Sequence, residues 1–391
     1  MLRQTDPEFI YYNSHAISTQ NYSKGQKEDA VARISEDRTT AIIPDISKYD
    51  LSIVRFDAVG LKDIPIFIPM IETGQSDPNK TVYRCTMNVR ISDGSGGVQS
   101  FTATENLIFF PQLLGLEQPT PPTIRPEYSN EYYYVYTIDH MNKLLDKCFL
   151  SVVNALQQQI NLFALEPITI NQVPPQVQFN KNTGKFKLYF DKRGFGKFGI
   201  PSGSDAFFDI WFNSNLYNLV SNFSGYFYED IVEDTRYFKF DFYKHLGTQY
   251  ETIDSIEYIV MEQENKSLEL WSPAANIVFT TDLIPSLSEQ VNISNLTGTS
   301  IDRVGNNNDT ENILTDIALP LDNPFDVQTI SYVPSAEYRM INLNNSAGRQ
   351  LKNINFSLFW RNKYNGALVP VKLSGGSYFS VKLMFRHKSQ R

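Results

Sequence analysis

Apolar and polar side chains alternate one by one through much of residues 336–391, and this pattern restricts the fold more than any other feature of the chain. Alternation with a period of two is typical of a β-strand with one buried face, because successive side chains point to opposite sides of a strand. In residues 353–362 the apolar positions are Ile354, Phe356, Leu358 and Trp360. Asn365-Gly366 then offers the two positive-φ residues of a tight hairpin turn. Because the alternation returns at Phe379, Val381, Leu383 and Phe385, residues 353–388 are predicted to form a three-stranded meander with one apolar and one basic face.

The same 56 residues are strongly basic. They contain ten Lys or Arg and one acidic residue, Glu337, for a net charge of +9, whereas residues 1–335 contain 25 basic and 42 acidic residues, for a net charge of −17. Such segregation usually marks a face turned toward an oppositely charged partner, which could be another copy of the chain. The candidate electrostatic interface comprises Lys372, Lys382, Arg386 and Lys388. An equally open interpretation is that these cations only keep an exposed sheet soluble, since edge strands often carry such charges.

The rest of the chain is also predicted to be mainly β-strand. Runs of strand-forming residues are bounded by Gly, Pro and Asn turns at 51–56, 64–71, 81–92, 98–110, 177–190 and 276–281. Residues 139–162 differ, because their apolar positions recur at three- and four-residue steps and predict one amphipathic helix. Successive hairpins with a single helix favour an all-β fold, an antiparallel sandwich or barrel.

Changes in composition suggest three parts of the chain. Residues 1–45 are polar and lack lasting periodicity, which predicts an extended N-terminal arm. Proline-rich segments at 119–126 and 167–175 are candidate boundaries. We therefore expect a first β lobe at 46–166, which includes the helix, and a second β-rich lobe at 167–391, which includes the basic meander.

The sequence gives little support for catalysis or metal binding. The four histidines lie far apart and in no metal-binding spacing, and Cys85 and Cys148 fit small buried hydrophobes better than a disulfide framework. Residues 194–199 match G-x-G-x-x-G, but Ile200-Pro201 cannot promptly begin the helix that a dinucleotide site needs. We expect no enzymatic activity, no cofactor and no metal.

Charge and hydropathy also limit the expected surroundings of the protein. No run of 18 apolar residues is present, so no membrane span is predicted, and residues 1–16 lack the apolar stretch of a secretory signal. With an isoelectric point near 5.2 the whole molecule repels nucleic acid at long range. Contact with a genome would therefore have to be local, through the basic C-terminal residues.

Several strings resemble those of jelly-roll capsid proteins of double-stranded DNA viruses, including virophages and Polinton-like viruses. These strings lie at 51–56, 64–69, 276–285, 332–339, 354–360 and 381–386. The resemblance implies upright antiparallel jelly-roll sandwiches, closed oligomers and no cofactor. Two architectures fit it. One is a double jelly roll, as in trimeric major capsid proteins. The other is a single jelly roll built from the two ends of the chain, with the region after the helix inserted as a large outer domain, as in pentameric penton or other minor capsid proteins.

The resemblance makes a virion structural protein the leading expectation. Its partners would be copies of the same chain, as a trimer or a pentamer, other capsid proteins and, through the basic C-terminus, the packaged genome. The alternative from another class is a carbohydrate-binding or host-attachment β-sandwich, whose exposed aromatic rings would stack on sugars. A hydrolase on a β scaffold has only scattered carboxylates in its favour.

Overall fold

The chain forms two compact units, one built from both ends of the sequence and one from its middle. The computed structural model describes residues 7–18, 21–23, 26–28, 30–60, 64–92, 97–113, 115–163, 169–195, 206–223, 226–230, 235–240, 249–267, 271–285, 289–290, 294–297, 300–303, 310–311, 313–319, 329–334, 340–343, 348–373 and 375–388. The first unit comprises Met1–Pro65 with Pro273–Arg391, and the second comprises Ile66–Ser272. This division differs from the expected lobes at 46–166 and 167–391, because strands on both sides of the long helix pair with one another.

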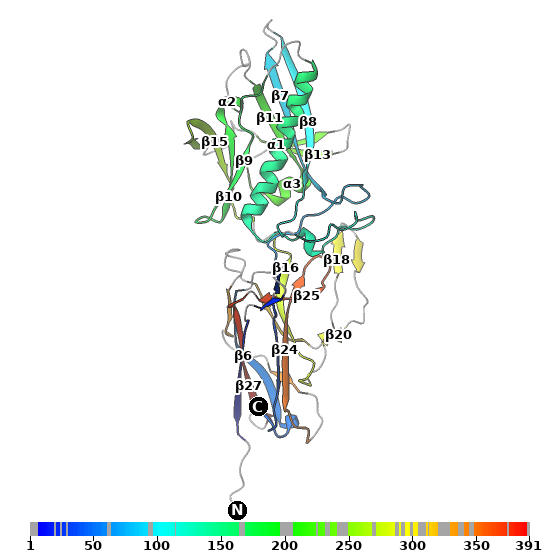
Figure 1. Cartoon of the computed structure of the whole chain (residues 1–391), viewed down its shortest axis with the longest axis vertical. Coiled ribbons are helices and arrows are strands. Elements are labelled where there is room, and N and C mark those ends of the chain that lie inside the picture. Colours follow the sequence, from blue (N-terminus) through cyan, green and yellow to red (C-terminus); the bar gives the residue numbers. More distant parts are fainter. Residues whose placement is uncertain are drawn as a thin grey trace, which may run out of the picture. The chain divides into compact units, whose positions relative to one another are not determined.

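Two antiparallel sheets make up the first unit (Figure 1). The sheet named here the β27 sheet has the order β1 (Phe9–Ile17), β27 (Tyr378–His387), β6 (Tyr49–Val59) and β22 (Thr329–Tyr332), and β23 (Ile341–Asn342) also pairs with β6. The β24 sheet has the order β21 (Ile313–Ala318), β16 (Ala274–Thr280), β24 (Asn353–Asn362) and β25 (Leu368–Pro370), and β5 (Arg33–Asp37) also pairs with β24. Of the two expected architectures, this is the single jelly roll with an insert, although the insert begins at Ile66, before the helix rather than after it.

Shorter elements complete the first unit. Four two-stranded pairs are β2 (Asn21–Ser23) with β3 (Gln26–Glu28), β4 (Ala30–Val31) with β26 (Lys372–Leu373), β17 (Glu289–Gln290) with β20 (Thr310–Glu311), and β18 (Ser294–Thr297) with β19 (Ser300–Arg303). The 3-10 turn η1 (Ile46–Lys48) precedes β6, and the Asp45 side chain caps it by accepting a hydrogen bond from the Ser47 amide.

The core of the first unit lies between its two sheets. Phe56 of β6 and Phe279 of β16 come from different sheets, are fully buried and meet edge to face with ring centroids 4.4 Å apart. The residues that the alternating pattern assigned to a buried face are buried, including Ile354, Phe356, Leu358, Trp360, Phe379, Val381, Leu383 and Phe385. The period-two pattern therefore located one face of each sheet correctly.

The expected three-stranded meander at 353–388 is wrong in its third strand. β24 and β25 form a hairpin, but β27 leaves for the opposite sheet, where it pairs with β1 on one side and β6 on the other. The turn between β24 and β25 also differs from the predicted one. Of Asn365 and Gly366, only Gly366 adopts a positive φ, of 69°, and the Gly366 amide donates a hydrogen bond to the Asn362 carbonyl. The Gly375-Gly376 reversal thus marks a crossing between sheets, which hydrophobic alternation cannot distinguish from a second hairpin.

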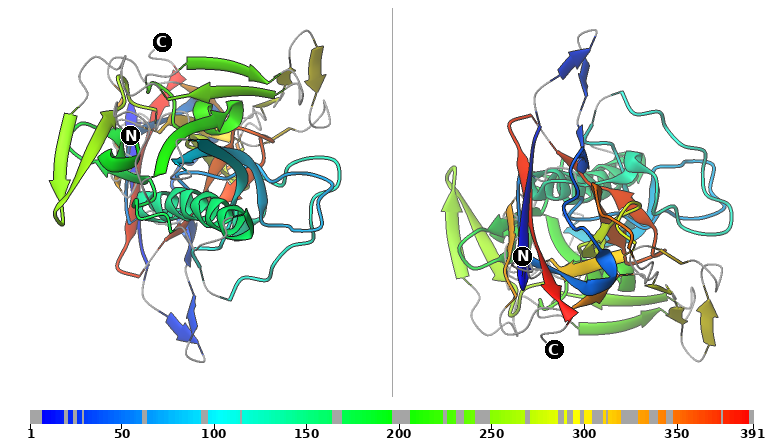
Figure 2. Two further views of the ribbon diagram at one scale, coloured as in Figure 1. Left: turned by 90° about the horizontal axis from the view of Figure 1, so that it is seen from above. Right: turned by 90° about the horizontal axis from the view of Figure 1, so that it is seen from below.

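The expected N-terminal arm is ordered as strands over part of its length. β1 pairs with β27 from Phe9 opposite Arg386 to Ile17 opposite Tyr378, and β5 pairs with β24. The right view of Figure 2 shows β1, in dark blue, running beside β27, in red. The outward faces of these strands are exposed and carry polar residues, so the sequence does not show a clear apolar alternation there.

The second unit combines two antiparallel sheets with the long helix. One sheet has the order β14 (Gln249–Ile253), β15 (Ile256–Glu262), β10 (Lys185–Asp191) and β9 (Gln176–Asn180). The other has the order β12 (Tyr226–Asp230), β13 (Thr235–Lys239), β11 (Ala206–Asn213), β7 (Lys80–Ser92) and β8 (Val98–Ile108). The remaining elements are η2 (Glu131–Tyr133), α1 (Ile138–Phe163), α2 (Lys192–Phe195) and α3 (Ser214–Leu219).

The helix predicted at 139–162 is confirmed as α1. Its apolar stripe, which includes Met141, Leu144, Leu145, Cys148, Val152 and Leu156, is buried. The helix contacts β7 and β8 of one sheet and β9 of the other, and Phe149 stacks on Phe212 with ring centroids 5.7 Å apart. Residues 64–71 are expected to form a strand, but they make only isolated β-bridges. Phe67 pairs with Val135, and Ile71 pairs with Thr81.

We predict that Phe279→Ala will lower the free energy of unfolding by about 3–5 kcal/mol, because it removes a buried ring that joins the two sheets of the first unit. Urea unfolding followed by circular dichroism measures this change. Val333→Ala is the matched control, since the Val333 side chain is 60% exposed, and it should shift the free energy by less than about 0.5 kcal/mol. Equal effects of the two substitutions would contradict the assigned core.

Candidate functional site

The basic C-terminal strand β27 is a central strand of its sheet. β1 and β6 are hydrogen-bonded to its two sides, so its cations do not protect an exposed sheet edge. Lys382 lies opposite Asn13 of β1 and opposite Arg55 of β6, and Arg386 lies opposite Phe9 and Asp50. Because these two cations are four residues apart in one strand, they share the outward face of the sheet.

The four cations of the predicted interface do not form one patch. Lys382, Arg386 and Lys388 follow one another along and just beyond β27, whereas Lys372 belongs to β26 and pairs with Val31. The residue after it, Leu373, accepts a hydrogen bond from Ser18, whose amide bonds to Ser377 at the opposite end of β27. About 25 Å of strand separates that end from Arg386. Arg339 and Arg391 of the basic segment lie outside the described residues.

Acidic and aromatic neighbours from other strands surround the β27 cations. The Lys382 Nζ atom lies 5.1 Å from the centre of the Tyr11 ring. Lys388 Nζ donates to Asn342 Oδ1 at 3.1 Å and lies 3.9 Å from the buried carboxylate of Asp50. All three cations of this strand region are half-buried. The charge of the segment is partly neutralised by Asp50, which is distant in the sequence.

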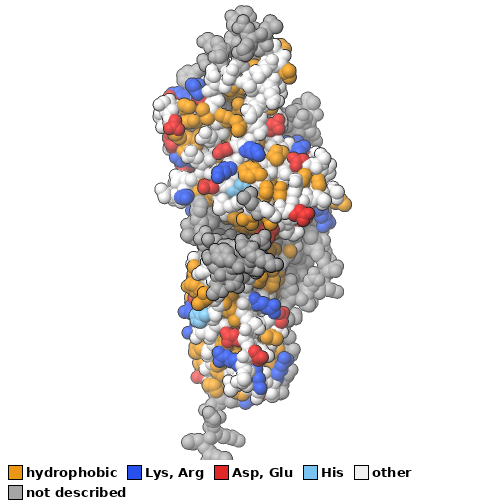
Figure 3. Space-filling model, in the orientation of Figure 1, with side chains coloured by type: hydrophobic (Ala, Val, Ile, Leu, Met, Phe, Trp, Pro, Cys, Tyr) orange, Lys and Arg blue, Asp and Glu red, His pale blue; other side chains and the backbone are white. Residues whose placement is uncertain are grey.

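Lys382 and Arg55 place like charges directly opposite each other, which alone would be unfavourable. The pair is tolerated because Arg55 Nε lies 2.9 Å from Asp57 Oδ2, and Asp57 also accepts a hydrogen bond from Ser331 at 2.7 Å. On the face drawn in Figure 3, basic and acidic side chains are interspersed among the described residues. Asp50 and Asp57 of β6 therefore make the surroundings of β27 less basic than the sequence of that strand suggests.

A carboxylate joins the edges of the two sheets in the first unit. Glu36 of β5 accepts hydrogen bonds from the hydroxyls of Tyr12 and Ser14 of β1, the latter at 2.5 Å. Arg38 lies 3.7 Å from the same carboxylate and stacks over the Tyr12 ring at 5.0 Å. Sequence reasoning missed this cluster, because its members lie in the segment interpreted as an arm.

This environment changes the acidity of both groups. Burial, followed by the hydrogen bond to and the charge of Glu36, raises the pKa of Tyr12 to about 12. Burial by itself would raise the pKa of Glu36. The hydrogen bonds donated by Ser14 and Tyr12, together with the nearby Arg38 guanidinium, outweigh burial and lower the pKa of Glu36 below its ordinary value. The ionised carboxylate is therefore the form that holds β1 against β5.

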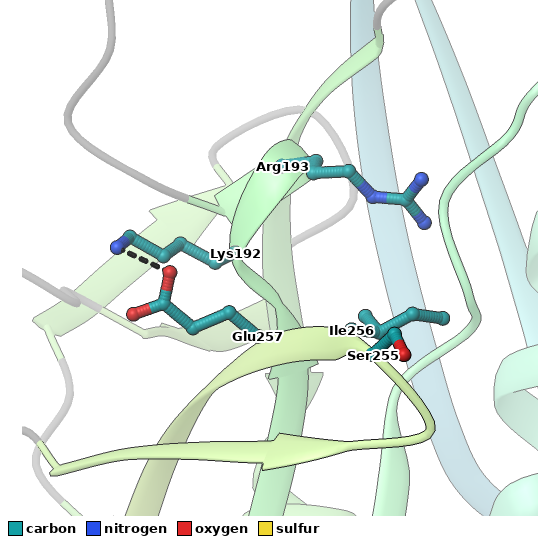
Figure 4. A pocket seen from close by; sticks show the side chains of 5 residues that line it. All are labelled: Lys192, Arg193, Ser255, Ile256 and Glu257. Atoms are coloured by element: carbon teal, nitrogen blue, oxygen red, sulfur yellow. Dashed lines mark hydrogen bonds and ion pairs between the residues drawn. The ribbon is translucent and has the colours of Figure 1, made fainter.

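The second unit contains a cavity of about 490 Å³, lined by Lys192, Arg193, Ser255, Ile256 and Glu257 (Figure 4). Its charges are paired within the protein. Lys192 Nζ lies 2.6 Å from Glu257 Oε2, and the Arg193 guanidinium binds the fully buried carboxylate of Asp191 at 2.6 Å. Figure 4 shows Arg193 directed away from the Lys192–Glu257 pair. The two ion pairs join α2 to β15 and to the end of β10, and they converge on no single chemical group.

The glycine-rich motif has a packing role at its first residue. A Cβ atom on Gly194 would lie 2.8 Å from the Phe208 ring and 3.0 Å from the Gln172 side chain, so only glycine fits there. Residues 196–200 lie outside the described part of the chain. Within the described ranges, no group of three or more His, Cys, Asp or Glu residues could hold a metal ion, and no helix there is long and apolar enough to cross a membrane.

Two antiparallel sheets packed as a sandwich place the first unit in the jelly-roll class, which includes viral capsid domains. Both ends of the chain form this single sandwich, and the second unit is inserted in it. A family model described as Sputnik minor capsid protein V18/19 matches residues 10–387. The chain belongs to this family and is a structural protein of a virion capsid. No curated protein matches it.

Solved structures share the fold, and two of them are from virophages. A chain from the 3.5 Å cryo-electron-microscopy structure of the Sputnik virophage has 19% sequence identity and a TM-score of 0.77, over 98% of this chain and 99% of that chain. The crystal structure of the selenomethionine-labelled mavirus penton protein has 16% identity and a TM-score of 0.61, over 97% of this chain and 100% of that chain. Neither comparison favours the carbohydrate-binding alternative.

We predict that Glu36→Gln will lower the free energy of unfolding by about 1–2 kcal/mol at neutral pH, because it removes the charged acceptor of two hydrogen bonds. Since the folded-state pKa of Glu36 is below its ordinary value of 4.5, the contribution is fully present above that value and is lost as the pH falls through the folded-state pKa. Urea unfolding at a series of pH values, with exposed Glu264→Gln as control, should show the wild-type advantage shrinking only below about pH 4.5. An advantage that grows on acidification would contradict this account.

Proposed function

We propose that this capsid protein is a penton-type subunit that assembles into a closed pentamer. The observation that carries the proposal is the single sandwich formed by both chain ends around one large insert. A trimeric major capsid protein of the double-jelly-roll type would instead place two successive sandwiches in the chain. The similarity to a protein named as the penton protein of mavirus, which covers that whole chain, also supports the proposal.

The mass of the purified full-length chain in solution tests this proposal. Light scattering over a range of concentrations should give a species of five times 44.8 kDa, and negative-stain images should show five-fold rings. A stable trimer would support the major-capsid alternative, and a protein that stays monomeric at high concentration would remove self-assembly altogether. In this role the protein acts through its shape and contacts and needs no catalysis.

The cations of β27 are proposed to contact an acidic neighbouring capsid subunit. Lys382, Arg386 and Lys388 lie along one strand region and keep part of their surface accessible, whereas Lys372 lies near the other end of that strand. Asp50 lies near Lys388, and Asp57 pairs with the neighbouring Arg55, so this face keeps too little one-signed charge for strong binding to a phosphate backbone, which depends on many neutralised phosphates. Contact with a capsid protein is therefore the better-supported role.

We predict that neutralising Lys382, Arg386 and Lys388 together with glutamine will weaken assembly in nucleic-acid-free buffer and flatten its dependence on ionic strength. Sedimentation at several salt concentrations measures both effects. The matched control neutralises the exposed residues Lys143, Lys181 and Lys266, which should leave assembly unchanged. If the β27 variant assembles normally but packages less genome, the contact is with nucleic acid instead.

A further inference from the structure

β1 forms one edge of the β27 sheet, and its outer side is open. Within the described residues it pairs with β27 only, and no backbone hydrogen bond reaches it from the other side. The Ser18 amide donates to the Ser377 carbonyl and the His387 amide to the Glu8 carbonyl, at the two ends of the ladder. Bonding residues alternate in an antiparallel pair. The amides and carbonyls of the odd-numbered residues of β1 therefore point toward the open edge.

This edge lacks the features that normally prevent strands of different molecules from pairing. Natural edge strands are protected by charged residues, proline, bulges or very short length. β1 is nine residues long and contains no Asp, Glu, Lys, Arg or Pro. Its register with β27 runs from Phe9 to Ile17 without a shift. A stable monomer would have little reason to keep such a strand at an open edge.

The side chains beside the open edge are apolar at both ends of the strand. Phe9 and Tyr11 are 39% and 54% exposed and stack with ring centroids 6.4 Å apart. At the other end Ile17, 73% exposed, lies opposite Tyr378, 41% exposed. The inward residues Tyr12 and Ser14 are bonded to Glu36, so the strand is fixed in place while its outer side remains available.

The opposite edge of the same sheet is also uncharged, although its strand is shorter, four residues against nine, and Pro334 follows it. β22 ends the sheet beyond β6, and the described residues 329–334 around it carry no charged side chain. Three antiparallel pairings lead from β1 through β27 and β6 to β22, so β1 and β22 run in opposite directions. A copy rotated about an axis along the strands would thus present β22 antiparallel to β1. Head-to-tail contacts of this kind close into rings.

We propose that β1 adds to the β22 edge of a second copy of this chain, so that the β27 sheet continues from one subunit into the next. This inference rests on the proposed self-assembly and specifies the surface that performs it. The occupant is an extended strand, because only a strand satisfies a row of alternating amides and carbonyls. It is a second copy because the complementary uncharged edge lies on this chain.

The test removes one outward amide without disturbing the pairing of β1 with β27. Asn13 is odd-numbered, and proline is tolerated on an edge strand where the N–H faces away from the sheet. In the full-length chain, Asn13→Pro should weaken self-association by at least about tenfold, measured by concentration-dependent light scattering. Asn13→Ala keeps the amide and should associate as the wild type does. Circular dichroism melts verify that both variants are folded.

A side-chain variant provides an independent test if the proline variant unfolds at a lower temperature than the wild type. Ile17→Lys places a charge beside the edge and should also weaken association, whereas Leu162→Lys, at a 90% exposed position of the second unit, should not. Normal association of a folded Asn13→Pro or of Ile17→Lys would overturn the edge proposal while leaving self-assembly intact. A wild-type protein that never associates would instead contradict the proposed function itself.

Discussion

The pairing of β27 with both β1 and β6 is the interaction on which the first unit depends. It brings together strands from the two ends of the sequence, from Phe9 opposite Arg386 to Ile17 opposite Tyr378. It also places the buried face of β27 over the β24 sheet, where Phe56 and Phe279 meet. Such contacts are far apart in the sequence and costly to form, because the chain between them must first be ordered. The middle of the chain, Ile66–Ser272, forms the second compact unit between β6 and β16.

The charge of a segment and the charge of a surface differ in this protein. Residues 336–391 are the most basic part of the sequence, yet β6 brings Asp50 and Asp57 alongside the cations of β27. Lys372, which has the same charge, lies in β26 and pairs with β4, away from the other cations. Electrostatic reasoning from sequence assumes that neighbours in the chain are neighbours in space, and a β-sheet breaks that assumption every time a strand changes sheets.

Family membership and the fold identify a structural protein of a virion capsid. The cavity of the second unit has its charges paired internally by Glu257 and Asp191. By contrast, the β27 sheet ends in β1, which contains no Asp, Glu, Lys or Arg, and no backbone hydrogen bond between described residues reaches its outer side. In a shell protein, unsatisfied backbone at an edge is a means of association, whereas the same feature in a solitary protein would promote aggregation.

The sequence alone determined the local elements: the strands with a buried face, the helix α1 and the absence of a recognisable catalytic motif. These follow from the period of hydrophobic residues, which is set by backbone geometry within a few residues. Only the tertiary structure decided that β27 joins the sheet of β1, that the insert spans Ile66–Ser272 and that Glu36 links two sheet edges. Those outcomes depend on hydrogen bonds and packing between residues that are not local in the sequence, from 22 positions apart for Ser14 and Glu36 to hundreds of positions for β1 and β27. A local pattern of hydrophobic residues does not specify which strand will be the partner.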